Sequence, residues 1–196
     1  MRCGFAHDDL REVAFVDCGL ADPSTQMGAR FVFARLDEAR FTDCDLTHAR
    51  FDGADLYAAR FQDCNLIGAG FPRARFHRAF GRAVVRSQVA FLDCNLELAD
   101  LAGARMAECD LSRSRLREAD LSGADLEGAN LADADLFQAL VDGARLARAD
   151  LRGAEVSGLD LRRLAGYRDL VIDADQQFRL LDAMGVDVRA SGDAAP

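Results

Sequence analysis

The sequence predicts an all-β solenoid, a chain coiled around one long axis and built from units of five residues. Two observations lead to this prediction. From Phe31 to Leu161, 25 of the 27 residues at every fifth position are Phe, Leu, Met or Val. Two residues earlier in each unit, from Ala29 to Ala154, the 26 residues are 19 Ala, 4 Cys, 2 Val and 1 Ser. A fixed spacing of large and small apolar residues indicates two inward positions per unit.

A period of five excludes the regular elements of globular proteins. On an α-helix, five residues rotate about 140° beyond a full turn, so the large residues would be spread around the helix. On a flat strand, an odd period sends successive large residues to opposite faces. The chain must therefore turn a corner once per unit to bury both apolar positions.

The repeated unit A-[DN]-L-x-x, cleanest in ADLSGADLEGANLADADLFQA, resembles the pentapeptide-repeat family. The resemblance covers most of the chain. It implies a right-handed quadrilateral β-helix with four units per coil, about eight coils in all, and a short C-terminal α-helix. We expect residues 1–168 to form the β-helix and residues 169–188 to form a capping or dimerisation segment. Residues 189–196 are expected to be a disordered tail.

Four units per coil would stack residues that are twenty apart. The sequence then predicts one ladder of phenylalanines, continued toward the C-terminus by leucines, and a second ladder on the opposite face. The first ladder comprises Phe31, Phe51, Phe71, Phe91, Leu111, Leu131 and Leu151, and the second begins with Phe41 and Phe61.

All six cysteines occupy the small inward position of their units, and Cys44 and Cys64 are expected to be vertical neighbours. The sequence contains no C-x-x-C pair of the kind that zinc sites use. We therefore expect buried reduced thiols, with a disulfide or a metal site as the alternative. No metal or cofactor is expected.

The formal net charge of −9 lies entirely in the second half of the chain. Residues 1–90 hold 12 acids and 12 arginines, whereas residues 91–196 hold 21 acids and 12 arginines. This imbalance disfavours direct binding to nucleic acid and favours a basic partner surface, although simple solubility explains it equally well. The chain has no run of 18 apolar residues and no secretory leader, so we expect no membrane span and a cytoplasmic location.

The repeat is interrupted at residues 22–29 and 77–90, and we expect loops there. The first interruption is rich in turn formers and shifts the register by one residue, and a bulge within a coil is the alternative. In the second, strict counting would bury Arg86, which would be costly, so we expect the chain to leave the coil rather than distort it. The candidate partner-binding residues are Asp22, Pro23, Ser24, Thr25, Gln26, Met27, His77, Arg78, Phe80, Arg82 and Arg86.

After Leu161 the repeat fades, and IDADQQFRLLDAMGV predicts a short helix. Asp173 is the expected N-cap, Gln176 completes a capping box, and Gly185 ends the helix. Phe178, Leu181 and Met184 share one face by their spacing. That face can cap the last coil, whose edge is otherwise unpaired, or join two chains into a homodimer.

Two loops and a terminal helix on a square β-helix resemble the Qnr subgroup of quinolone-resistance proteins. This resemblance implies protection of DNA gyrase and topoisomerase IV from quinolone-type inhibitors. Rows of carboxylates on a rod can partly imitate duplex DNA, which carries one charge per ~1.7 Å, and outward arginines in the first half argue against complete imitation. The acidic candidates are Asp100, Asp110, Asp120, Asp125, Asp135 and Asp150.

The alternative function is that of a scaffold or toxin-immunity protein that uses the same rod for another protein partner. An enzyme is not expected. The chain has three histidines, no P-loop, no G-x-G-x-x-G motif and no nucleophile motif. We interpret the recurring Asp before each central residue as structural, because it can accept backbone amide hydrogens at a corner or remain solvated.

Overall fold

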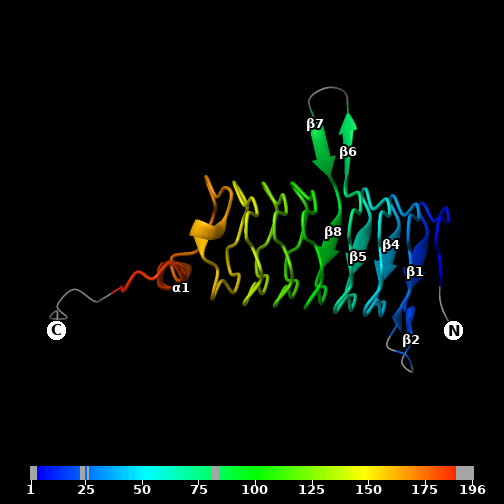
Figure 1. The fold of residues 1–196 in the computed structure, drawn as a ribbon, viewed down its shortest axis with the longest axis horizontal. Coiled ribbons are helices and arrows are strands. Elements are labelled where there is room, and N and C mark those ends of the chain that lie inside the picture. Colours follow the sequence, from blue (N-terminus) through cyan, green and yellow to red (C-terminus); the bar gives the residue numbers. More distant parts are fainter. Residues whose placement is uncertain (1–3, 23–24, 26, 81–83, 189–196) are drawn as a thin grey trace.

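The computed structural model describes residues 4–22, 25, 27–80 and 84–188. Their chain forms a rod of stacked coils, with its N-terminus at one end and a short helix at the other (Figure 1). The rod is the right-handed quadrilateral β-helix that the resemblance implies.

Parallel ladders hold the coils together. One face carries the four-stranded sheet β1–β4–β5–β8, formed by Ala14–Val16, Arg40–Thr42, Arg60–Gln62 and Ala90–Leu92. All its neighbours pair in parallel. Single β-bridges extend the sheet toward the C-terminus. As a result, one outward-facing position is stacked in a vertical row through eight successive coils. The residues in this row are Ala14, Arg40, Arg60, Ala90, Asp110, Asn130, Asp150 and Val171.

The core contains the two apolar positions of each unit. From Phe31 to Leu159, the central residues of the coils and the small residues before them are almost all buried. Phe31 and Phe51 stack with ring centroids 4.9 Å apart, and Phe51 and Phe71 repeat this distance. The predicted stacking of residues twenty apart is therefore confirmed. Each buried Phe or Leu contributes roughly 1.5–3 kcal/mol, so stability accumulates coil by coil.

Phe91 does not lie where the sequence predicted it. It stacks on Phe61 at 4.7 Å, in the ladder that begins with Phe41, and not on Phe71. The reason is an excursion of the chain: Arg40 pairs with Arg60, twenty residues on, but Arg60 pairs with Ala90, thirty residues on. The excursion adds ten residues, or two units, so Phe91 and the leucines after it move to the opposite face.

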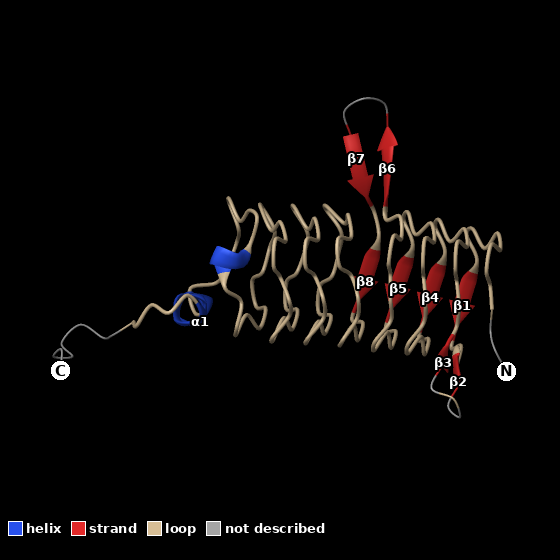
Figure 2. Cartoon of the chain, viewed as in Figure 1, coloured by secondary structure: helices blue, strands red, loops and turns tan. Residues whose placement is uncertain are grey.

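Two β-hairpins interrupt the coils and project from opposite sides of the rod (Figure 2). The first pairs β2 (Ala21–Asp22) with β3 (Met27–Gly28), and the second pairs β6 (His77–Phe80) with β7 (Val84–Ser87). In both expected ranges the chain leaves the coil as a hairpin and not as a bulge or a distorted face, but Ala29, Val89 and Ala90, which were expected in the loops, belong to the coil. After each hairpin a buried residue, Ala29 or Val89, returns the chain to the core.

The corners account for the recurring Asp and Asn residues. At most of the described corners, one residue adopts a positive φ, such as Asp133 at 59° or Gly123 at 67°. The Asp or Asn three residues earlier accepts the amide hydrogen of the residue two positions on, as Asp120 Oδ1 does from Ser122 at 2.9 Å. This Asx turn is the structural role expected from the repeat.

The cysteines lie in the inward slot, and all five that the structure describes are free thiols. The main-chain pairing of Asp45 with Asn65 places Cys44 and Cys64 as vertical neighbours, as predicted. Burial raises the pKa of the Cys44 thiol from its ordinary 9.0 to about 11, and burial also raises the pKa of Cys109.

We expect Cys44 and Cys109 to resist iodoacetamide in the folded protein at pH 8, because the thiolate is the nucleophile and little of it forms. Peptide mass spectrometry should find both modified only after unfolding in urea. The unfolded thiol ionises first, so the contribution of Cys44 to stability is full below pH 9 and is lost as the pH rises through about 11. Rapid labelling of either thiol in the folded protein would contradict their burial.

Candidate partner-binding surface

The β6–β7 hairpin is held to the rod by Arg78. Its guanidinium Nη2 lies 2.9 Å from the Asp37 carboxylate and 3.8 Å from that of Asp55. The same group lies over the Tyr57 ring, 4.7 Å from the centroid. Arg78 therefore reaches back over the coils of Asp37 and Tyr57 and fixes the foot of the hairpin on them. We call Arg78, Asp37 and Tyr57 the latch.

The latch holds a charge that burial would otherwise disfavour. Asp37 is 7% exposed, and its second oxygen has no hydrogen-bond partner among the described residues. The hydrogen bond to Asp37 raises the pKa of Arg78. A buried carboxylate is stable only when a cation pairs with it. Asp37 therefore favours the position of the hairpin in which Arg78 contacts the rod.

We expect Arg78→Ala to lower the free energy of unfolding by about 1–2 kcal/mol, less than for a fully buried pair because Arg78 is half exposed. Amide exchange in β6 and β7 should accelerate about tenfold, as measured by hydrogen exchange and mass spectrometry. The double variant Asp37→Asn, Arg78→Gln should recover most of the stability. Arg11→Ala, which breaks the exposed pair with Asp9, is the matched control. Unchanged exchange in the hairpin of Arg78→Ala would exclude the latch.

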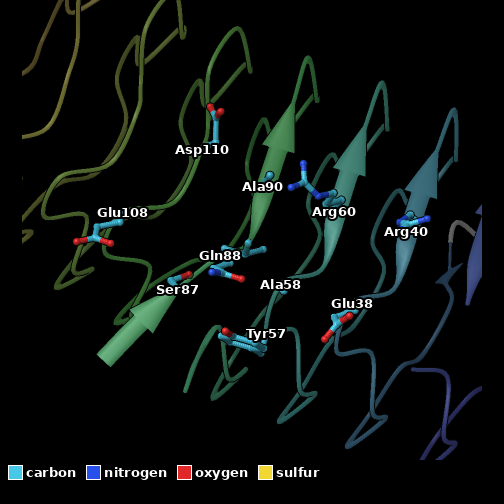
Figure 3. A pocket seen from close by; sticks show the side chains of 11 residues that line it. Glu38, Arg40, Tyr57, Ala58, Arg60, Ser87, Gln88, Ala90, Glu108 and Asp110 are labelled. Atoms are coloured by element: carbon cyan, nitrogen blue, oxygen red, sulfur yellow. The ribbon is translucent and has the colours of Figure 1, made fainter. Parts of the chain in front are cut away.

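A groove opens beside the foot of the hairpin (Figure 3). It has a volume of about 660 Å³ and lies between the end of β7 and the sheet that carries Arg40 and Arg60. Ala90 and Asp110 continue that outward position, so Arg40 and Arg60 line the groove toward the N-terminal end of the rod, together with Glu38, and Glu108 and Asp110 line it toward the C-terminal end. The groove is polar and charged, which suits a protein surface as its partner.

The structure brings some of the predicted residues of the second hairpin together and leaves others undescribed. His77 and Arg78 are half-buried at the foot of β6. Phe80 and Arg86 are paired through their main chains with Val84 and Arg78. Arg82 lies outside the described residues. The predicted cations therefore do not act alike, because Arg78 is committed to the latch.

The first hairpin lies against the rod through Gly28. A Cβ atom at this position would lie 2.2 Å from the main-chain carbonyl carbon of His48, so only glycine fits. Met27 is 41% exposed, and Asp22 accepts the amide hydrogen of Thr25 at 3.4 Å. The candidates Pro23, Ser24 and Gln26 lie outside the described residues.

The six predicted acidic residues do not form one face. Asp100 and Asp120 are vertical neighbours, and Asp110 and Asp150 belong to the opposite face with Asn130 between them. Asp125 and Asp135 occupy the two remaining faces. Each of the six also accepts the amide hydrogen two residues on, which uses one carboxylate oxygen. These six acceptors are Asp100, Asp110, Asp120, Asp125, Asp135 and Asp150.

Charge reverses along two opposite faces of the rod. Arg30 and Arg50 stack in the N-terminal half of one face, and Asp100 and Asp120 follow them in the C-terminal half, with Gly70 between. The opposite face repeats this order with Arg40 and Arg60 before Asp110 and Asp150. The acidic surface predicted from composition is thus spread around the C-terminal half of the rod.

The C-terminal helix α1 (Gln176–Ala183) closes the last coil with Gln176 and Leu180 rather than with the face of Phe178, one of the two roles that face was expected to have. Gln176 Nε2 donates to the main-chain oxygens of Leu151 and Ala154, both at 2.7 Å, and Leu180 is buried beside it. Asp173 is not the N-cap. Its carboxylate accepts the amide hydrogen of Gly153, while its own N–H donates to Gln176 Oε1 at 2.7 Å.

The predicted apolar face of α1 remains accessible. Phe178 is 53% exposed, and Leu181 and Met184 are half-buried. Val171, Ile172 and Val186 are also exposed, and they come from the segments just before and after the helix. Exposed apolar side chains at the end of a rod are typical of a surface that another protein covers.

The repeat model for pentapeptide repeats matches residues 27–63, 94–131 and 129–163, with eight copies, and so covers more than half of the chain. The chain belongs to the pentapeptide-repeat family. No curated protein matches the sequence. Among solved structures, this pentapeptide-repeat protein is similar to QnrB1, described as a plasmid-mediated fluoroquinolone resistance protein.

Two structures of QnrB1 illustrate the match. A trypsin-treated variant of it has a TM-score of 0.88 at 25% identity, covering 96% of this chain and 88% of that chain. The full-length form has a TM-score of 0.87 at 26% identity, covering 94% and 86%. The pentapeptide-repeat protein described here is therefore Qnr-like in fold.

None of the helices in the part of the chain that the structure describes has the length and hydropathy needed to cross a membrane. Within the same residues, no group of three or more His, Cys, Asp and Glu side chains is arranged to hold a metal ion.

Proposed function

We propose that this chain binds a type II topoisomerase, DNA gyrase or topoisomerase IV, and protects it from quinolone-type inhibitors by binding rather than by catalysis. The observation that carries the proposal is the match to a fluoroquinolone resistance protein over 96% of this chain. The protein would act in the cytoplasm, where its partner meets the drug.

The charge distribution supports a division of labour along the rod. The acidic C-terminal half attracts a basic surface of the kind that holds DNA, and the field of many carboxylates speeds such an encounter. The arginines of the N-terminal half make that half a poor image of DNA. We infer that the hairpins make the specific contacts and that the acids steer the approach.

A supercoiling assay with gyrase and ciprofloxacin tests the proposal. Addition of the protein should restore supercoiling at a drug concentration that otherwise stops it. The control is a chain of the same charge whose fold is disrupted at the core. If no protein concentration restores activity, the protection model fails, and a pulldown with gyrase subunits then decides between silent binding and no binding.

We further propose a homodimer through Phe178, Leu181 and Met184. Phe178→Arg should convert the dimer into a monomer in sedimentation equilibrium, because an exposed apolar ring is replaced by a charge. The matched control is Leu98→Arg, at an equally exposed leucine on the side of the rod. A wild-type chain that sediments as a monomer at all concentrations would exclude this contact.

A further inference from the structure

A second groove lies on the C-terminal side of the β6–β7 hairpin, with a volume of about 460 Å³. The foot of the hairpin contributes His77 and Ser87, which are register partners across its two strands. The rod contributes Arg105 and Arg145 from one vertical row of outward residues, and Asp125 lies between them in the coil that separates them. Two corner glycines also line the groove, and a Cβ atom at either one would meet no backbone or side-chain atom closer than 4.0 Å, so the space above them is open.

Arg105 is exceptional in its row of outward residues. In the other coils of this row a carboxylate and a guanidinium are vertical neighbours and pair with one another. These pairs are Asp9 with Arg35 at 3.5 Å, Asp55 with Arg75 at 3.1 Å, and Asp125 with Arg145 at 3.9 Å. Arg105 stands between the second and third pairs, directly after the hairpin, and its own vertical neighbour, Asp125, pairs with Arg145 instead. Among the described residues, no carboxylate lies within ion-pair distance of it.

Ser87 supplies a second unmatched group. It is 3% exposed, and its hydroxyl has no hydrogen-bond partner among the described residues. His77 Nδ1 is likewise buried and unpartnered. An unsatisfied buried polar group destabilises the fold by about 1–3 kcal/mol, so such groups require an explanation. Both lie at the foot of the hairpin and line the groove that Arg105 also lines.

We propose that this groove binds a carboxylate of the partner protein, an Asp or Glu side chain. Both carboxylate oxygens accept from the forked Arg105 guanidinium, and one of them also accepts from the Ser87 hydroxyl, so Arg105 gains the carboxylate partner that the other arginines of its row have. A carboxylate matches the forked guanidinium in shape and charge. Asp125 does not repel it strongly, because Arg145 lies between Asp125 and Glu127 and pairs with both carboxylates.

The inference rests on the proposed function only for the identity of the partner. Binding of gyrase should weaken about tenfold in Arg105→Ala and by a similar factor in Ser87→Ala, with Arg105→Lys intermediate because it keeps the charge but loses the fork. The matched control is Arg115→Ala, which removes an equally exposed arginine from another face. Ser87→Ala should leave the free energy of unfolding unchanged or higher, because it deletes an unsatisfied hydroxyl.

A second arm requires no topoisomerase. The NMR signals of Arg105 Nε–H and the Ser87 amide should shift saturably with sodium acetate, and not with sodium chloride at equal ionic strength. The shifts should be absent from Arg105→Ala. A response to phosphate without one to acetate would overturn the carboxylate assignment, as would no response to either. If wild type binds gyrase and Arg105→Ala binds equally well, the groove is excluded while the proposed function stands.

Discussion

Removal of the β6–β7 hairpin should abolish protection of gyrase while the rod remains folded. The variant deletes residues 79–88 and leaves His77 and Arg78 as the two corner residues between Phe76 and Val89. The deletion removes ten residues, which is the length that the excursion adds, so Phe91 still stacks on Phe61. Protection should be lost because the specific contacts and the groove at Ser87 leave with the hairpin.

The measurement is the supercoiling assay, together with circular dichroism and a thermal melt to confirm the fold. A matched deletion removes residues 22–27 and leaves Ala21 and Gly28 as a corner, because the first excursion adds six residues: Ala14 pairs with Arg40, twenty-six residues on. This shorter hairpin offers less contact area, so the second variant should retain part of the protection. Full protection by the variant without β6–β7 would remove that hairpin from the mechanism.

The coils could be predicted from the sequence because the period of five constrains them at every unit. Phe31 and Phe51 had to meet once the chain turned four corners per coil, and their rings do stack. The position of Phe91 could not be predicted in the same way. The ten extra residues are a multiple of five, so the large residues still fall at every fifth position in the sequence. The face of the rod on which Phe91 lies nevertheless changes, because ten residues are half a coil.

The site was harder to predict than the coils. The second interruption was recognisable as an excursion from the coil because Arg86 could not be buried. The partners of Arg78 were not recognisable, because Asp37 and Tyr57 lie far from it in the sequence and look like ordinary corner residues. Arg105 was hidden for another reason. It differs from the other arginines of its row only by lacking a paired carboxylate, which becomes visible once the rows are aligned.

The terminal helix shows how local spacing can mislead. Phe178, Leu181 and Met184 share a face by sequence, and that face was equally suited to capping or to dimerisation. The last coil instead offers main-chain oxygens at Leu151 and Ala154, and the Gln176 side chain donates to both, although Leu151 also accepts the amide hydrogen of Ala154. Gln176 therefore turns toward the rod, and the apolar face is left for another contact.

Phe61→Ala should have the largest effect on stability, about 3–5 kcal/mol, because the ring is fully buried and packed on both sides. It stacks on Phe41 and on Phe91 at 4.7 Å each, and meets Phe51 edge-on at 5.8 Å. Its removal leaves a cavity between three coils that a stiff ladder cannot close. Urea denaturation monitored by circular dichroism, at a fixed protein concentration, measures the loss.

Phe61→Leu is the matched variant, and it should lower the free energy of unfolding by less than about 1.5 kcal/mol. Leucine is the residue that follows in the same ladder, where Leu111 and Leu131 lie at the levels after Phe91 and are fully buried. Because each coil contacts only its neighbours, the cavity should weaken the rod locally. Exchange should therefore rise first in β4, β5 and β8, the sheet next to the latch, and protection of gyrase should fall with it. Equal stability of the Ala and Leu variants would mean that the aromatic ladder does not hold the coils together.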